Sequence, residues 1–267
     1  MESHDDDLTQ FALHGAPVLP DDGHVAFVEH DGARLWYAAF GAGMPLVLLH
    51  GGLGHSGNWG YQVSALVAAG YRVVTIDSRG HGRSTRDAQP YRYARMASDL
   101  FVVMDALGMA RAALVGWSDG ACTALLAAMQ QPERVAGVLF FACNVNPDGA
   151  KEFVMTPVIE RCFVRHKQDY AQLSATPDEF DGFVAAVSTM QKTQPDCSAQ
   201  ELAAVRVPMT IVQGEHDEFI RREHAEYLAR SIPGASLTVL PGVSHFAPLQ
   251  RPALFNRTVL DFAAALR

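Results

Sequence analysis

Five residues near the middle of the chain have the types and spacing that a nucleophilic serine needs. The sequence Gly-Trp-Ser-Asp-Gly at residues 116–120 follows an apolar run ending at Val115 and precedes a helix-like run beginning at Ala121. A Gly-x-Ser-x-Gly between a strand and a helix forms a turn so tight that the positions two residues before and two residues after the serine need glycine. The turn exposes the hydroxyl at a helix N-terminus, where the helix dipole favours developing negative charge. We therefore predict that Ser118 is a catalytic nucleophile.

A serine hydroxyl is a poor nucleophile at neutral pH, so it needs a general base and an acid that orients the base. The partners of such a serine follow later strands, in the order acid and then histidine. Asp217 follows the second-last predicted strand and His245 follows the last one, which makes them the leading candidates for acid and base. A purely structural loop role is the alternative for each. His216 as base with Glu215 as acid is a second alternative, although it leaves the last loop without a role.

The oxyanion formed during acyl transfer needs two backbone N–H donors. The first is predicted to be that of Asp119, the residue after the nucleophile. A glycine-rich loop at residues 50–54 supplies the second, and we favour Gly52 with Leu53 as runner-up, because glycine lets the backbone approach a substrate closely. His50 in the same loop is expected to be structural, bonding across loops.

Three side chains close to the predicted site in the sequence are candidates for substrate contact: Asp119, Trp59 and Trp117. The Asp119 carboxylate would attract a substrate ammonium group if it faces the pocket, which would favour amino-acid esters. The alternative is that it stabilises the helix N-terminus, and Trp117 can equally point beneath the turn. No metal site is predicted, because the 11 histidines and 4 cysteines lack the spacing of metal-ligand motifs.

The composition describes a globular chain with ample material for a core, since 49% of the residues are hydrophobic and 19% are charged. A net charge of −8 makes nucleic acid an unlikely partner. No apolar stretch approaches the roughly 18 residues of a membrane span, and the acidic start at residues 1–7 lacks the apolar region of a signal peptide. The scattered cysteines are expected to be buried free thiols in a reducing cytoplasm.

Predicted strands and helices alternate along most of the chain. After a hairpin at 25–40 with an Asp-Gly turn, strands are predicted at 45–50, 71–77, 111–115 and 135–142, and helices at 58–69, 93–107 and 121–129. This alternation indicates a parallel sheet covered by helices on both faces. From about 144 to 202 only helices are predicted, at 151–173 and 177–193. The alternation then resumes with strands at 207–212 and 236–240 and helices at 222–230 and 252–266.

These elements predict an α/β fold with a mostly parallel, eight-stranded sheet. The core comprises residues 23–144 and 203–267, and residues 145–202 form a helical lid inserted after the sixth strand. A helical insertion of this size within a parallel-sheet domain is most simply a lid over the strand ends. Residues 1–22 are polar and punctuated by proline and glycine, and are expected to form a loose N-terminal arm.

The chain resembles the α/β-hydrolase fold superfamily from about residue 24 to the end. The matching pieces are the segments 49–52, 77–84 and 116–120, together with Asp217 and His245. In that superfamily the Asp-x-Arg-Gly-x-Gly-x-Ser segment at 77–84 shapes a loop below the site, which implies structural roles for Asp77 and Arg79. The Gly-Trp-Ser-Asp-Gly form is most similar to the group of biphenyl hydrolase-like proteins and valacyclovir hydrolase, which cleave esters, including amino-acid esters. Ala121 departs from the second glycine of many relatives.

The resemblance implies a cofactor-free serine esterase that acts on a small to medium carboxylic ester through an acyl-enzyme. The same Ser-His-Asp set supports C–C bond hydrolysis, lactone opening and cofactor-free perhydrolysis, so these stay open as alternatives. A non-catalytic ligand receptor is a further alternative, because fold alone does not dictate function. The sequence leaves the acyl group, the leaving group and the oligomeric state open.

Overall fold

A computed structural model describes residues 6–267, so the acidic segment 1–5 lies outside the described residues. Its eight strands form one sheet in the order β1-β2-β4-β3-β5-β6-β7-β8. The second strand pairs antiparallel with β1 and β4, and the other pairs are parallel. This confirms the predicted fold class. The strands are β1 (His24–His30), β2 (Ala33–Phe40), β3 (Met44–Leu49), β4 (Tyr71–Ile76), β5 (Ala112–Trp117), β6 (Val135–Phe141), β7 (Met209–Gly214) and β8 (Ser236–Leu240).

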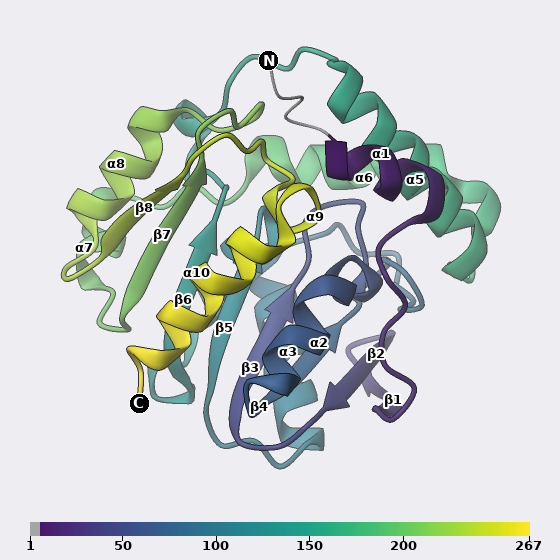
Figure 1. Ribbon diagram of the computed structural model, residues 1–267, viewed down its shortest axis with the longest axis horizontal. Coiled ribbons are helices and arrows are strands. Elements are labelled where there is room, and N and C mark those ends of the chain that lie inside the picture. Colours follow the sequence, from purple (N-terminus) through teal and green to yellow (C-terminus); the bar gives the residue numbers. More distant parts are fainter. Residues whose placement is uncertain (1–5) are drawn as a thin grey trace.

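Helices cover both faces of the sheet. Figure 1 shows α2 (Gly60–Ala68) and α10 (Pro252–Ala264) in front of the strands, with the short α9 (Ala247–Gln250) above α10. The opposite face carries α3 (Tyr93–Ala106), α4 (Asp119–Gln130) and α8 (Arg222–Ser231). Two layers of helices around a parallel sheet bury both faces of the strands, which is why the strand sequences are apolar throughout instead of alternating.

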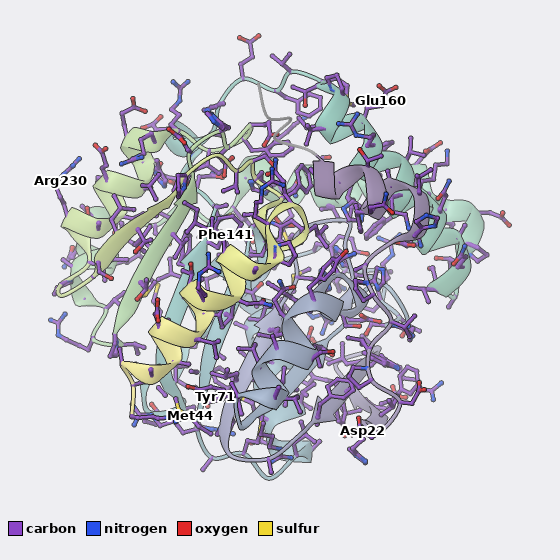
Figure 2. The ribbon with its side chains drawn as sticks, viewed as in Figure 1. Asp22, Met44, Tyr71, Phe141, Glu160 and Arg230 are labelled. Carbon is purple, nitrogen blue, oxygen red and sulfur yellow. The ribbon has the colours of Figure 1, made fainter. Side chains whose placement is uncertain are left out.

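The buried side chains accordingly form two clusters, one on each face. Within β5, Leu114 belongs to the cluster under α3 and α4, and its neighbour Val115 belongs to the cluster under α2 and α10. On the latter face Phe141, at the end of β6, packs on Phe255 of α10 with ring centroids 5.1 Å apart, and it lies near the centre of Figure 2. Successive residues of a strand point to opposite faces, so one short strand anchors both cores.

The chain between β6 and β7 is helical, as expected, with α5 (Pro157–Leu173), α6 (Phe180–Thr193) and α7 (Ala199–Ala204). The first of these helices was expected from residue 151 but begins at Pro157. The Thr156 hydroxyl accepts the N–H of Ile159 at 3.2 Å, and a residue before proline avoids the helical region, so Thr156 caps the helix and ends the preceding extended segment. That segment instead follows the loop after β7, where the Lys151 N–H donates to the Phe219 carbonyl at 2.7 Å.

The expectation of a loose arm at 1–22 is wrong for residues 6–14. Residues Asp6–His14 form helix α1, which packs against α5, and Figure 1 shows the two helices together. Leu8 and Phe11 are 0% and 1% exposed. Their spacing of three places both on one face of a helix, so a segment that is polar on average still has an apolar face to bury.

None of the helices within residues 6–267 combines the length and the apolar character that crossing a membrane requires.

Candidate active site

Backbone strain gathers at the carboxyl ends of three neighbouring strands. Ser118, between β5 and α4, has φ 54° and ψ −121°. Leu53 after β3 and Ala142 after β6 also have positive φ, at 63° and 58°. Positive φ is uncommon for residues other than glycine, and strain of this kind clusters at functional sites. The strain therefore marks this edge of the sheet as the place of the site.

The two glycines that flank Ser118 are required by close packing. A Cβ on Gly116 would overlap the carbonyl of Gly120, and a Cβ on Gly120 would overlap the carbonyl of Leu49. The turn therefore brings helix α4 directly against the end of β3. This is the steric reason for the Gly-x-Ser-x-Gly sequence, and it holds the half-buried Ser118 at the N-cap of α4, directly after β5.

The structure brings His245 and Asp217 together from the loops after β8 and β7. The Nδ1 atom of His245 lies 3.1 Å from each carboxylate oxygen of Asp217. When Nδ1–H donates to this carboxylate, Nε2 is left as a proton acceptor. The Asp217 carboxylate also accepts the N–H groups of Phe219 and Ile220, both at 2.9 Å, so its own loop fixes its orientation.

A further hydrogen bond ties the loop of His245 to the serine turn. The indole Nε1–H of Trp117 donates to the carbonyl of His245 at 2.9 Å. Since Trp117 directly precedes Ser118, this bond holds the histidine loop beside the candidate nucleophile. An imidazole oriented by a carboxylate can transfer protons to and from a neighbouring hydroxyl.

The alternative base and acid lie elsewhere. His216 and Glu215 form a loose pair, with Nε2 and Oε2 3.8 Å apart and side chains 42% and 51% exposed. The Glu215 carboxylate also accepts the N–H of Gly242 at 2.8 Å. Glu215 and His216 are neighbours in one exposed turn, whereas the buried pair of Asp217 and His245 meets at the strained edge of the sheet. The geometry therefore favours the latter pair as acid and base.

Sequence reasoning missed a second carboxylate beside His245. Glu218 accepts the backbone N–H of His245 at 2.9 Å, and burial raises the pKa of Glu218 above its ordinary value. Burial alone would lower the pKa of His245, but the charge and hydrogen bonds of Asp217, followed by the charge of Glu218, outweigh it and raise that pKa. In the sequence, Glu218 is marked only by its place next to Asp217. Its contact with His245 could not be read there, because it joins loops 27 residues apart.

The candidate oxyanion donors belong to two segments that adjoin Ser118. The N–H of Asp119 is the first of helix α4, and the first N–H groups of a helix have no partner inside it. On the other side, a Cβ added to Gly51 would lie 3.3 Å from the Cβ of Ser118, so the loop after β3 touches the serine. The choice between Gly52 and Leu53 for the second donor stays a prediction.

His50 has the structural role expected for it. Its Nδ1 lies 2.8 Å from the carbonyl of Gly51, and its Nε2 accepts the N–H of Ser78 at 3.0 Å. Burial lowers the pKa of His50 to about 4. The ring is therefore neutral at pH 7, with one nitrogen donating and the other accepting, and it links the loops after β3 and β4.

Asp77 and Arg79 are structural as well. The buried Asp77 carboxylate accepts the N–H groups of Ser56 and Arg83 at 2.7 and 2.9 Å. Burial alone would raise its pKa, but nearby positive charge and these hydrogen bonds lower it. Arg79 makes a two-pronged contact with Asp99 at 2.6 and 2.7 Å. These bonds fix the loop after β4, on which the loop of His50 rests.

The structure corrects the expectation that Trp59 and Trp117 contact substrate. Trp59 is 0% exposed and packs against Trp117 and Phe255, with ring centroids 6.0 and 6.1 Å apart. Trp117 is also buried, because the alternation along β5 directs its side chain to the face under α2 and α10. Both rings support the turn from beneath, as the alternative for Trp117 anticipated.

The sequence matches the alpha/beta hydrolase family over residues 46–258. The chain belongs to this family. The hydrolase is 28% identical to the serine hydrolase BPHL of Mus musculus, over 89% of this chain and 85% of that protein. It is 29% identical to the 2-hydroxy-6-oxononadienedioate/2-hydroxy-6-oxononatrienedioate hydrolase 2 of Pseudomonas putida, over 86% of this chain and 91% of that protein.

Among solved structures, the hydrolase is similar to one described as Est816, an N-acyl homoserine lactone degrading enzyme. The two share 28% sequence identity with a TM-score of 0.71, over 89% of this chain and all of the other. These relatives cleave different kinds of bond, so membership in the family shows a hydrolase acting on a small molecule and leaves the bond to be argued from the site.

Asp119 of the hydrolase is 6% exposed, and its carboxylate contacts side chains from two other helices. The hydroxyl of Tyr93, at the start of α3, donates to it at 2.8 Å. The amide nitrogen of Gln191, from α6, lies 3.1 and 3.2 Å from its two oxygens. Burial raises the pKa of the Asp119 carboxyl. Sequence reasoning singled out Asp119 but missed both partners.

The four cysteines are free and buried, as predicted. Two of them are close neighbours, since the sulfur atoms of Cys122 and Cys143 lie 2.9 Å apart beneath the first turn of α4. Within residues 6–267, no group of three or more His, Cys, Asp or Glu side chains is arranged to hold a metal ion.

Proposed function

We propose that this hydrolase is a serine esterase that cleaves an uncharged carboxylic ester of small to medium size. The observation that carries the proposal is the hydrogen-bonded pair of His245 and Asp217 beside the strained Ser118. His245 removes the Ser118 proton as the hydroxyl oxygen attacks the acyl carbon, and the N–H groups of Asp119 and Gly52 stabilise the oxyanion. His245 then protonates the leaving alcohol, and water activated by the same base releases the acid.

The charge around His245 favours an uncharged substrate. The carboxylates of Asp217, Glu218 and Asp119 all act to raise the pKa of this histidine, so each lies close enough to interact with its charge. A substrate carboxylate would be repelled by the same field in a site of low dielectric. The Pseudomonas putida relative is named for a dioate, and a dianion of that kind suits this site less well than a neutral ester.

The hydrogen bonds that the Asp119 carboxylate already accepts favour neutral esters over amino-acid esters as substrates. Its carboxylate already accepts hydrogen bonds from Tyr93 and Gln191, so a substrate ammonium group would have to displace the amide of Gln191. The same contact supports a lid role for residues 145–202, because Gln191 reaches from α6 to the turn that carries the nucleophile.

The proposal is tested with a series of substrates at one enzyme concentration. We expect the fastest turnover on p-nitrophenyl esters, with an optimum between the C2 and C12 acyl chains, and slower turnover on a valine ester. An N-acyl homoserine lactone and a vinylogous 1,5-diketone acid test the lactone and C–C alternatives. Turnover of either compound by a folded enzyme that cleaves no ester would refute the esterase proposal.

The activity of the enzyme should rise with pH, because only neutral His245 can accept the serine proton. Asp217 and Glu218 raise the pKa of His245, so kcat/KM is low below that pKa and reaches a plateau above it. Replacing Glu218 by Gln removes one negative charge and lowers the pKa of His245, which shifts the rising limb to lower pH. The measurement is kcat/KM for one ester from pH 5 to 9.

The matched control for this pH profile is Glu223→Gln, which removes the same charge from an exposed position at the start of α8. Its profile should coincide with that of the wild type. A Glu218→Gln profile that also coincides with the wild type would show that Glu218 does not act on His245.

A further inference from the structure

We propose that Tyr93 and Gln191 are positioning residues for the oxyanion hole, acting through the Asp119 carboxylate, and that the hole is complete only while α6 lies against the serine turn. The inference rests on the proposed function, because it takes the N–H groups of Asp119 and Gly52 as the oxyanion donors. Three elements meet at this carboxylate: α3 through Tyr93, α4 through Asp119 itself and α6 through Gln191.

The fold alone does not account for a buried carboxylate at position 119. Burying an ionised carboxylate is costly unless it is paired or well hydrogen-bonded. The ion pairs found among residues 6–267 do not include Asp119, and the hydrogen bonds found there for its carboxylate come from Tyr93 and Gln191. The hydrogen bonds from Tyr93 and Gln191 thus hold the Asp119 carboxylate in place. Asp119 is the residue that directly follows the nucleophile.

The carboxylate also contacts the second candidate donor. A Cβ added to Gly52 would lie 2.6 Å from Oδ2 of Asp119 and 2.5 Å from Nε2 of Gln191. The carboxylate and the amide therefore lie directly against the Cα of Gly52, and a side chain at this position would push both of them away. Asp119 contributes one donor through its own N–H and touches the residue that contributes the other. Fixing its side chain thus fixes the spacing of the two N–H groups.

The same two hydrogen bonds reduce an electrostatic conflict. A carboxylate next to a developing oxyanion would repel it, and the repulsion is strong in a buried site. The Tyr93 hydroxyl and the Gln191 amide both direct donors at the carboxylate, which draws its charge away from the oxyanion. Burial and the neighbouring Asp119 raise the pKa of Tyr93 well above its usual range, so the hydroxyl stays a donor at every working pH.

The test measures kcat and KM of Tyr93→Phe and Gln191→Ala on the best p-nitrophenyl ester. We expect kcat to fall about 10- to 100-fold, since small misplacements of reacting groups and loss of oxyanion stabilisation have effects of this order. KM should change less than about twofold, because the ground-state ester does not use the hole. Binding of phenylboronic acid, whose tetrahedral adduct places an oxygen in the hole, should weaken in parallel with kcat.

Two matched controls remove similar groups that do not touch Asp119. Tyr91→Phe removes a hydroxyl from another buried tyrosine, whose ring packs against His81 and Phe183. Gln194→Ala removes a bond from the end of α6 to the Tyr91 carbonyl, at 3.4 Å. Both should keep the wild-type kcat. Gln191 has an exposed side chain, so Gln191→Ala is expected to fold, which a thermal melt would verify.

Substitutions at position 119 distinguish a positioning role of the carboxylate from a role in substrate recognition. Asp119→Asn keeps an oxygen that can accept from Tyr93 and Gln191, so on p-nitrophenyl butyrate and on a valine ester alike it should retain at least about tenfold more kcat than Asp119→Ala. A loss confined to the valine ester in Asp119→Asn would instead make Asp119 an ammonium site and overturn the proposal. So would wild-type kcat in Gln191→Ala. Ester hydrolysis that still depends on Ser118 would show that only the positioning role, not the esterase function, has failed.

Discussion

Replacing Ser118 by alanine should lower kcat for p-nitrophenyl ester hydrolysis by about 10⁵- to 10⁶-fold, the size of effect that follows removal of a triad nucleophile. Ser118 is the residue that the turn between β5 and α4 holds in a strained conformation at the carboxyl edge of the sheet. An organophosphonate should label the wild-type enzyme at this residue and leave the alanine variant unlabelled, as intact-mass spectrometry would show.

The backbone at the same position gives a second readout. Ser118 has φ 54° and ψ −121°, a conformation that costs a residue with a Cβ about 1–3 kcal/mol and glycine little. Ser118→Gly should therefore melt several degrees above Ser118→Ala while being equally inactive. The comparison separates the loss of the hydroxyl from damage to the fold.

A suitable control for the hydroxyl is Ser98→Ala on α3, whose hydroxyl bonds only within its own helix, to the Ala94 carbonyl at 3.2 Å. Its kcat should equal that of the wild type. More than about 1% of wild-type activity in Ser118→Ala, or phosphonate labelling that survives the change, would mean that another residue is the nucleophile.

The parts of the site that could be predicted are those fixed by chain order. The alternation of strands and helices determines which loops share the carboxyl edge of a parallel sheet, so Ser118, Asp217 and His245 could be brought together without coordinates. The role of the glycines in the serine turn was predictable for a different reason, since the sharpness of a strand-to-helix turn is a local property. The structure adds the hydrogen bond between Asp217 and His245 that the order alone implied.

The parts that could not be predicted depend on packing between distant segments. Tyr93 and Gln191 are separated from Asp119 by 26 and 72 residues in the sequence. No local sequence pattern predicts that the Gln191 amide of α6 points toward Asp119. Glu218 contacts His245 only because two loops close on one another. Helix α1 was missed because the average polarity of its segment hides the two residues, Leu8 and Phe11, that anchor it.

Replacing Asp217 by asparagine should lower kcat by about 10³- to 10⁴-fold with little effect on folding. Asparagine keeps an oxygen that can accept the N–H groups of Phe219 and Ile220, which the aspartate now holds at 2.9 Å. It loses the charge that orients and stabilises the His245 imidazolium, and its amide can favour the wrong tautomer of the ring. Steady-state kinetics, together with a thermal melt close to that of the wild type, would check the expectation.

The neighbouring acids make this prediction discriminating. Glu215→Gln should leave kcat within about twofold of the wild type, because Glu215 pairs with His216 at the surface. Glu218 bonds the backbone of His245 and not its ring, so Glu218→Gln should shift the pH profile without a loss comparable to that of Asp217→Asn. If Glu218→Gln proved the more damaging change, Glu218 would be the acid. A large loss in Glu215→Gln would revive the pair of His216 and Glu215. The relative losses of kcat in Glu215→Gln, Asp217→Asn and Glu218→Gln thus decide which carboxylate orients the base.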